Sequence, residues 1–255
     1  MTAGRPLETS ALTHEGRVRT NNEDALCVRA DEGLFVVADG MGGHENGEWA
    51  SAAIAEAMQN VVLPAGFDEA SQAIADALHR ANATIHAEAE SRGLQMGSTV
   101  VVLLVRDGRF AILWVGDSRA YLHRDGELVR LSHDHTQVQE MIDRGLLEPG
   151  DAEGHPMGHI LARAMGVREE VEVDVVADEV ESGDVFLLCS DGLMARVDDV
   201  EIAAALADPD AESRAERLVR MTLERGAPDN VTIITVGIPQ TTMLRLNQPT
   251  HLVTP

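Results

Sequence analysis

Residues 34–40 have the sequence LFVVADG, an apolar run that stops at Asp39 and a glycine. This pattern predicts a buried strand that ends in a loop at the aspartate. Asp117 and Asp191 also follow apolar runs and have a glycine neighbour, and Asp229 comes just before such a run. Because strand ends can meet at one edge of a sheet, we expect these four carboxylates to converge.

Converging carboxylates indicate a metal site. Desolvated like charges raise one another's pKa and weaken folding unless cations neutralise them. Because the donors are oxygens, without histidine or cysteine at ligand spacing, the pattern favours Mg²⁺ or Mn²⁺ over zinc. The glycine beside Asp39, Asp117 and Asp191 permits close backbone approach. Any single Asp-Gly pair is equally typical of a turn, and we interpret the pairs at 107–108 and 125–126 as hairpin turns only.

The remaining pattern predicts one α+β domain over residues 8–238, followed by a short tail at 239–255. Alanine-rich segments with apolar residues at helical spacing predict helices at 48–62 and 69–90, separated at 64–66. Strands in adjacent hairpins and helices in pairs predict mainly antiparallel sheets with helices on their outer faces. The other expected strands are 98–106, 109–116, 171–176, 185–189 and 231–237, and the other expected helices are 137–143, 200–206 and 211–225.

The composition excludes several classes of function. The 255 residues include 43 acidic and 20 basic side chains, a net charge of −23, and every basic residue is an arginine. The absence of lysine excludes a Walker-type phosphate loop, a Schiff-base enzyme and a kinase, and the acidic balance argues against a nucleic-acid partner. With no leader and no apolar run near the roughly 18 residues of a membrane span, we expect a soluble, cytoplasmic protein without membrane contact. Cys27 and Cys189 are expected to be buried free thiols.

Six short motifs occur in order along the chain: GRVRTNNED at 16–24, VADGMGGH at 37–44, GST at 97–99, GDSRAY at 116–121, SDGL at 190–193 and DNVT at 229–232. Together they resemble the bacterial branch of the protein phosphatase 2C family, the metal-dependent Ser/Thr phosphatases. The resemblance covers nearly the whole chain. It implies a fold of two packed antiparallel sheets flanked by pairs of helices, which agrees with the element pattern.

The resemblance also implies roles for individual residues. Asp39 would bridge two Mn²⁺ or Mg²⁺ ions. The Gly40 carbonyl would bind the first ion, and Asp191 and Asp229 would bind the second. The remaining roles are water-mediated metal contacts for Glu23 and Asp24, a third ion held by Asp117 and Asp191, and phosphate binding by Arg19.

The activity that the resemblance implies is hydrolysis of phosphoserine and phosphothreonine by direct attack of a metal-bridging water. Two cations lower the pKa of that water and neutralise developing charge, and an arginine suits the other phosphate oxygens. Met41 stands where some family members have a histidine, so the general acid is either His44 or a metal-bound water. The expected partners are phosphorylated Ser/Thr proteins, including a Ser/Thr kinase and its targets, and the enzyme is expected to act as a monomer.

Residues 132–166 correspond to a flap that bacterial relatives carry beside the active site, and we expect this segment to affect substrate choice. It contains His155 and His159, four residues apart as zinc ligands on a helix would be. Pro156 between them weakens a shared helical face, so the spacing is a poor zinc signal.

Three other functions fit parts of the sequence. A cysteine-dependent phosphatase would use Cys189 and Arg196, but six residues separate them where that chemistry needs five, and a buried thiolate is disfavoured. A serine hydrolase would use Ser118 as its nucleophile. Ser118 lies after a hairpin in the middle of the chain, whereas the corresponding motif of that family lies near the start of the chain, so this function is disfavoured. A metal-binding pseudophosphatase or signalling scaffold would keep the fold without turnover, although every expected ligand position is filled.

Overall fold

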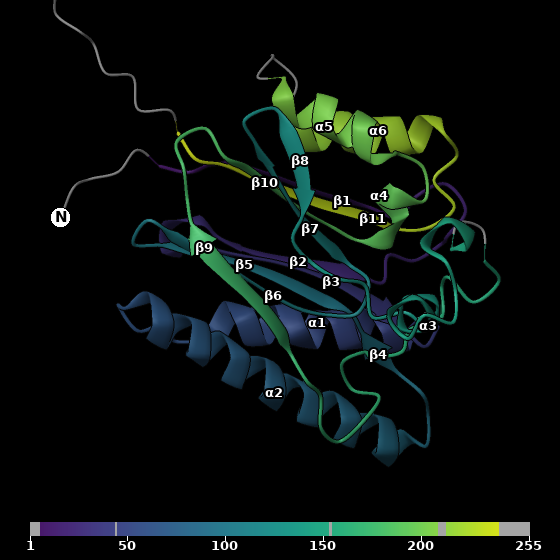
Figure 1. Ribbon diagram of the computed structural model, residues 1–255. Helices are drawn as coiled ribbons and strands as arrows, with labels where there is room; N and C mark the ends of the chain where they lie inside the picture. Colours follow the sequence, from purple (N-terminus) through teal and green to yellow (C-terminus); the bar gives the residue numbers. More distant parts are fainter. Residues whose placement is uncertain (1–5, 44, 153–154, 209–212, 240–255) are drawn as a thin grey trace, which may run out of the picture.

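Two antiparallel sheets lie face to face in the computed structural model, and a pair of helices covers the outer face of each sheet (Figure 1). The structure describes residues 6–43, 45–152, 155–208 and 213–239. The four layers, helix, sheet, sheet and helix, agree with the α+β sandwich that the sequence predicts.

Both sheets are antiparallel throughout. The first has the strand order β1-β11-β10-β7-β8 and the second the order β2-β3-β5-β6-β9, with the short β4 paired to the end of β3. The first sheet consists of β1 (Glu8–His14), β7 (Arg119–Arg124), β8 (Glu127–Arg130), β10 (Val185–Cys189) and β11 (Val231–Gly237). The second consists of β2 (Asp24–Arg29), β3 (Leu34–Met41), β4 (Gly97–Ser98), β5 (Val100–Arg106), β6 (Arg109–Val115) and β9 (Asp174–Glu179).

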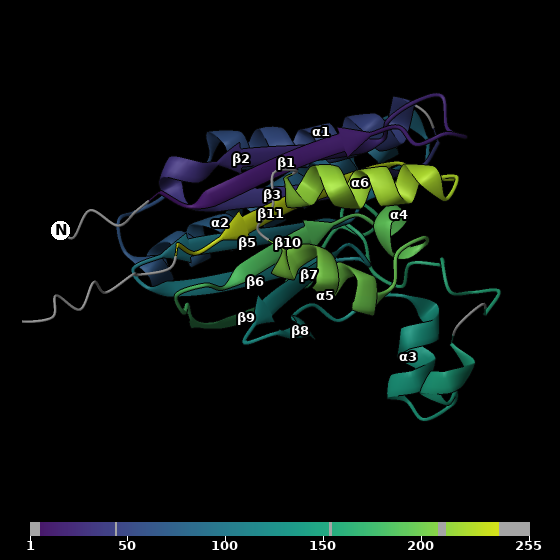
Figure 2. The same cartoon turned by 90° about the horizontal axis from the view of Figure 1, so that it is seen from above.

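The long helices cover the sheets in pairs: α1 and α2 lie on the second sheet, and α5 and α6 lie on the first (Figure 1). The short α3 stands away from the sandwich at one end (Figure 2). No helix in the described part of the chain is both long and apolar enough to cross a membrane. The helices are α1 (Glu45–Asn60), α2 (Phe67–Arg92), α3 (Gln137–Asp143), α4 (Asp191–Met194), α5 (Asp199–Ala207) and α6 (Arg214–Glu224), with short 3-10 turns at Ala30–Glu32 and Pro149–Asp151.

The position of β3 explains why residues 34–38 are apolar without interruption. Successive side chains of a strand point to opposite faces of its sheet. Leu34 therefore packs against α1 and α2, whereas Phe35 packs between the two sheets. In that inner layer, Phe110 of β6 and Phe186 of β10 meet with ring centroids 4.9 Å apart. Both faces of β3 are buried, so no polar alternation is tolerated there.

Most predicted elements are confirmed, with shifted ends. Both predicted hairpin turns have positive φ at their two central residues, and residues 61–66 separate α1 from α2. The strand expected at 171–176 is instead β9, which begins at Asp174 because its partner β6 ends at Val115. The helix expected at 211–225 is α6, which Ser213 caps through its side chain, and residues 211–212 lie outside the described part.

Two expectations about strands are wrong. β3 does not stop at Asp39 but continues to Met41, because Gly40 and Met41 pair with β4. The sequence pattern also missed β1, which lacks a continuous apolar run.

Candidate metal centre

Five aspartates meet where the two sheets end on the same side. Asp24 begins β2 and lies opposite Asp39 of β3 in the strand register. Asp117 lies in the connection from β6 to β7, which crosses between the sheets, Asp191 begins α4, and Asp229 comes just before β11. The second sheet therefore supplies two of these residues, the first sheet supplies two, and a crossing connection supplies the fifth.

An open cleft of about 780 Å³ lies over this cluster. Four of the five aspartates line it, and the buried Asp24 lies opposite one of them, Asp39, in the strand register. The opposite wall comes from the segment 159–164 and from Val167. The other residues that line the cleft include Arg19, Glu23, Gly40, Met41, Gly42, Gly43, Thr99, Pro228 and Asn230.

The GST motif fixes the backbone of Asp39. The Ser98 hydroxyl donates to the Asp39 carbonyl oxygen at 2.9 Å, and the Thr99 amide donates to the same oxygen at 2.8 Å. The Asp39 amide donates to the Thr99 hydroxyl at 3.1 Å. These bonds satisfy both backbone groups of Asp39, so its side chain is held at the cleft without competing for them.

Asp24 is a buried carboxylate with one partnered and one unpartnered oxygen. Its Oδ2 accepts from the Ser190 hydroxyl at 2.8 Å and from the Thr232 hydroxyl at 2.7 Å. Its Oδ1 is buried and has no hydrogen-bond partner in the described structure. Leaving a buried charged oxygen unsatisfied is costly, so this atom is placed where a cation or a bound water would suit it.

Asn230 attaches the segment before β2 to the start of β11. Its side-chain amide donates to the carbonyls of Glu15 and Asn21 at 3.0 and 2.9 Å, and its Oδ1 accepts from the Glu23 amide at 2.8 Å. Glu23 in turn lies against Gly47 of α1, where a Cβ would be 2.0 Å from the Glu23 Oε2. The DNVT motif thus positions Glu23 at the cleft.

Gly40 is required for the close approach of α1. A Cβ at Gly40 would lie 2.1 Å from the Gly47 carbonyl oxygen and 2.6 Å from the Glu23 carbonyl oxygen. The Gly40 amide donates to that Glu23 carbonyl at 3.0 Å. Any larger residue would push α1 away from the end of β3, which explains the glycine beside Asp39.

The cluster is electrostatically strained. Burial raises the pKa of Asp24 and of Asp117 to about 7, with repulsion from Asp191 adding to each. Burial and repulsion from the neighbouring carboxylates raise the pKa of Asp39 well above its ordinary value. The pKa of Asp191 is raised by burial and by Asp229. A site that disfavours its own negative charges in this way is suited to bind positive charge.

Arg19 lies at the cleft but binds a predicted metal ligand. Its guanidinium donates from Nε and Nη2 to the two carboxylate oxygens of Asp229 at 2.9 and 2.7 Å. The Arg19 side chain is 55% exposed and that of Asp229 is 37% exposed. The resemblance assigns Arg19 to phosphate, and its location in the cleft agrees with that role, although its present partner is a carboxylate.

The donor set fits hard divalent cations. Carboxylates and the Gly40 backbone line the cleft at the cluster, and oxygen ligands of this kind are those that Mg²⁺ and Mn²⁺ prefer. Asp24 Oδ1 is in addition a buried carboxylate oxygen without a hydrogen-bond partner in the described structure. As the side chains lie, no three His, Cys, Asp or Glu of the described residues form a coordination group. Both carboxylate oxygens of Asp229 accept from Arg19, so direct binding of an ion by Asp229 requires one of these two side chains to turn.

The region predicted as a flap supplies one wall of the cleft through His159 and the residues that follow it. His155 accepts from the Met157 amide at 3.2 Å, and residues 156–159 form a turn, so the helical zinc pair considered from the sequence is not formed. His44, the candidate general acid, lies outside the described residues.

A polar network that the sequence did not reveal connects this flap to the sheets. Arg119 donates from Nε and Nη2 to Asp134 at 2.6 to 3.1 Å. The buried His135 accepts from the Gly116 amide at 3.0 Å through Nδ1 and contacts Asp174 at 3.1 Å through Nε2. The base of the flap is thereby tied to the loop that carries Asp117.

The two nucleophiles considered as alternatives are both inaccessible. Cys189 is fully buried, and burial raises the pKa of its thiol to about 12. Ser118 is 1% exposed, and its hydroxyl bonds to the Thr99 hydroxyl at 2.6 Å. Neither side chain can act as an activated nucleophile on a substrate in the cleft. Both cysteines are buried free thiols, as expected.

Fold and site together define a two-sheet α+β protein whose carboxylates meet at one end of the sandwich in a form suited to divalent cations. Residues 13–232 match the model of the protein phosphatase 2C family, and the chain belongs to this family.

Named relatives support this membership. The chain is 37% identical over 234 residues to the serine/threonine protein phosphatase PstP of Mycobacterium tuberculosis, and it spans 45% of that protein's length while 91% of this chain is covered. It is 33% identical over 240 residues to protein phosphatase PhpP of Streptococcus pneumoniae, a match that covers 91% of this chain and 98% of PhpP. Among solved structures, it is similar to the catalytic domain of PstP in complex with two manganese ions, with a TM-score of 0.80 and 36% identity over 92% of this chain and 99% of that chain.

Proposed function

We propose that this chain is a metal-dependent protein phosphatase that hydrolyses phosphoserine and phosphothreonine. The observation that carries the proposal is the convergence of five aspartates at one open cleft, among them Asp24, Asp39 and Asp117, whose pKa values are raised. The relatives PstP and PhpP, named as protein phosphatases, support the same activity.

The metal would be Mn²⁺ or Mg²⁺, bound as two or three ions. Asp39, the Gly40 carbonyl, Asp191 and Asp229 would hold the first two, and Asp117 with Asp191 would hold the third. Glu23 and Asp24 would contact the ions through water, which agrees with the buried Asp24 Oδ1 that lacks a partner in the described structure. When bound, such cations supply a water of lowered pKa and neutralise phosphoryl charge.

The chain's own residues would orient the substrate. Arg19 can turn from Asp229 to the phosphoryl oxygens, because its side chain is more than half exposed and a guanidinium binds phosphate bidentately. Met41 carries no proton to donate at the position next to Gly40. The leaving alkoxide would therefore be protonated by a water at the centre or by His44.

We further propose the domain limits and cellular context. Residues 8–238 would form the phosphatase domain, with 132–166 as a flap that affects substrate choice, and 239–255 as a short tail. The wall that this segment gives to the cleft supports the flap assignment. The protein would act as a cytoplasmic monomer on phosphoproteins, including a Ser/Thr kinase and its targets, without nucleic-acid or membrane partners.

Substitution of the bridging aspartate tests the activity. Purified protein is expected to hydrolyse p-nitrophenyl phosphate with Mn²⁺ and to stop when chelator is added. Asp39→Asn is expected to lower the rate at least about a hundredfold, since it removes the charge proposed to hold both cations. Asp107→Asn, in the hairpin turn between β5 and β6, is the matched control and is expected to keep the wild-type rate. Wild-type protein without turnover under any divalent metal would instead favour a pseudophosphatase or signalling scaffold.

A further inference from the structure

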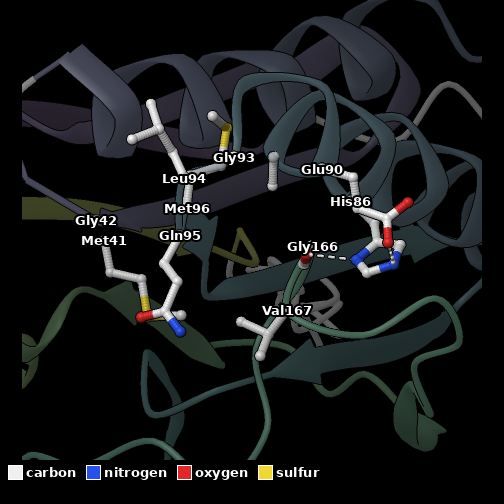
Figure 3. A pocket seen from close by; sticks show the side chains of 11 residues that line it. Met41, Gly42, His86, Glu90, Gly93, Leu94, Gln95, Met96, Gly166 and Val167 are labelled. Carbon is white, nitrogen blue, oxygen red and sulfur yellow. Dashed lines mark hydrogen bonds and ion pairs between the residues drawn. The ribbon is translucent and has the colours of Figure 1, made fainter.

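A second hollow lies beside the cleft and is lined mainly by apolar side chains. It has a volume of about 400 Å³ and lies between the end of α2, the residues that follow it, and residues 166–167 (Figure 3). Met41, Leu94, Met96 and Val167 provide its apolar lining. We call this hollow the apolar pocket. A volume of this size is at the lower end of the range of ligand pockets.

Glycines and one histidine hold the walls of the apolar pocket together. Gly42 has φ +121°, and a Cβ there would lie 2.6 Å from the Gln95 carbonyl oxygen. Gly166 has φ +81°, and a Cβ there would lie 2.2 Å from a side-chain carbon of Ile85. His86 of α2 contacts the Gly166 carbonyl at 3.2 Å through Nδ1 (Figure 3). The pocket is therefore a built feature of the fold, with walls bonded to one another.

The apolar pocket adjoins the cleft over the metal centre and shares part of its wall. Met41, Gly42 and Val167 line both of them. The tips of Met41 and Val167 converge over Gly97, at 2.8 and 3.1 Å from the position that a Cβ would take there. These two side chains therefore stand between the cleft and the pocket, and a molecule in the cleft has to pass only them to reach the pocket.

The residues around the cleft and the apolar pocket include apolar side chains that are exposed to solvent. Leu94 is 48% exposed, Val167 is 51% exposed, and Ile160, across the cleft, is 43% exposed. Other aliphatic side chains of the described residues are also exposed, but these three lie together at the two cavities beside the acidic centre. Such exposed apolar groups at a binding cleft are typical of a surface that is covered by a ligand.

We propose that the apolar pocket binds an aliphatic or aromatic side chain of the phosphoprotein substrate, a few residues from the phosphorylated serine or threonine. This inference rests on the proposed phosphatase activity and makes Leu94, Met41 and Val167 specificity-determining residues. Met41 is only two residues from Asp39, and an extended peptide covers about 3.3–3.6 Å per residue. The side chain that enters the pocket therefore lies within about three residues of the phosphorylated one.

The first test compares substrates on the wild-type enzyme. A set of phosphothreonine peptides with alanine at three positions on either side receives one leucine at a time, and kcat/KM is measured with Mn²⁺. Leucine at one of these positions is expected to raise kcat/KM about tenfold, the effect of burying one such side chain in a half-open pocket. Peptides that are all hydrolysed within about twofold of one another would overturn the inference.

The second test places a charge in the pocket. Leu94→Asp is expected to reduce the leucine preference to within about twofold. Val62→Asp is the matched control, because Val62 is 85% exposed and follows α1, outside both cavities, and it is expected to keep the tenfold preference. Because each preference is a ratio within one protein, partial loss of folded enzyme does not change it. A Leu94→Asp enzyme with the full preference would overturn the assignment of the pocket.

The two proposals fail in distinguishable ways. Turnover of p-nitrophenyl phosphate and of all peptides without preference would leave the phosphatase activity intact and overturn the pocket alone. Absence of turnover on every substrate would overturn the proposed function, and the inference with it.

Discussion

Replacing Asp24 with asparagine should change how the stability of the metal-free protein depends on pH. The pKa of this carboxyl is raised from 3.8 to about 7, mainly by burial. The folded state therefore binds this proton more tightly than the unfolded chain does. The resulting stabilisation is complete below about pH 4 and is lost as the pH rises through about 7.

The size of the effect follows from the pKa. Each unit of pKa corresponds to about 1.4 kcal/mol, so wild-type protein should lose about 2–3 kcal/mol between pH 5 and pH 7.5 through Asp24 alone. For a domain of this size, that is a fall in Tm of about 5–10 °C. The asparagine side chain in the variant carries no titratable proton, and its oxygen can still accept from the hydroxyls of Ser190 and Thr232. The Asp24→Asn variant should therefore not show this part of the loss of stability between pH 5 and pH 7.5.

The assay is thermal unfolding of both proteins in chelator at pH 5 and pH 7.5. Any pH-independent cost of burying the amide cancels, because each protein is compared with itself. Asp184→Asn is the contrasting control: its carboxylate is also buried but accepts from Arg124 at 2.8 and 2.7 Å. That variant should lose about 2 kcal/mol at both pH values, because the buried carboxylate of Asp184 is replaced and the partly exposed Arg124 loses its charge partner. If Asp24→Asn loses as much stability with pH as wild type, the account of the strained cluster is wrong.

Two other substitutions test the surroundings of the centre. Arg19→Ala should raise KM for phosphopeptides about tenfold in steady-state kinetics, while it changes stability by less than about 1 kcal/mol, because its ion pair with Asp229 is half exposed; an unchanged KM would argue against phosphate binding by this residue. Gly16→Ala should lower the free energy of unfolding in urea by more than about 3 kcal/mol, because Gly16 has φ +83° and a Cβ there would lie 2.2 Å from the Asp229 carbonyl oxygen. Gly145→Ala is the control and should cost about 1 kcal/mol, because Gly145 has φ +66° but open space around it. Equal costs would show that the contact between Gly16 and Asp229 is unimportant.

The sequence was sufficient for the parts of the site that depend on local pattern. Asp39, Asp117 and Asp191 each follow an apolar run beside a glycine, and this arrangement correctly indicated that they converge, although Asp39 lies within β3 rather than at its end. Asp24 gave no such signal on its own. It follows a polar segment and begins a strand whose faces are only partly buried, so its assignment depended on the resemblance to a family.

The contacts that control the aspartates could not be predicted from one sequence. The pairing of Ser190 and Thr232 with Asp24 joins residues 166 and 208 positions away. The bond from Arg19 to Asp229 spans 210 positions. Such contacts arise only when both sheets are assembled, because no local periodicity records them. The same reason explains the missed β1, which is half exposed and becomes a strand by pairing with β11 at the far end of the chain.

The separate origin of the aspartates makes the distance between the sheets a determinant of the centre. Asp24 and Asp39 belong to the second sheet, while Asp191 and Asp229 flank strands of the first. The thickness of the apolar layer between the sheets, where Phe110 meets Phe186, therefore sets how far apart the two halves of the ligand set stand. Because close-packed interiors transmit small changes in volume, the aromatic packing inside the sandwich would set the spacing of the proposed ion ligands without touching them.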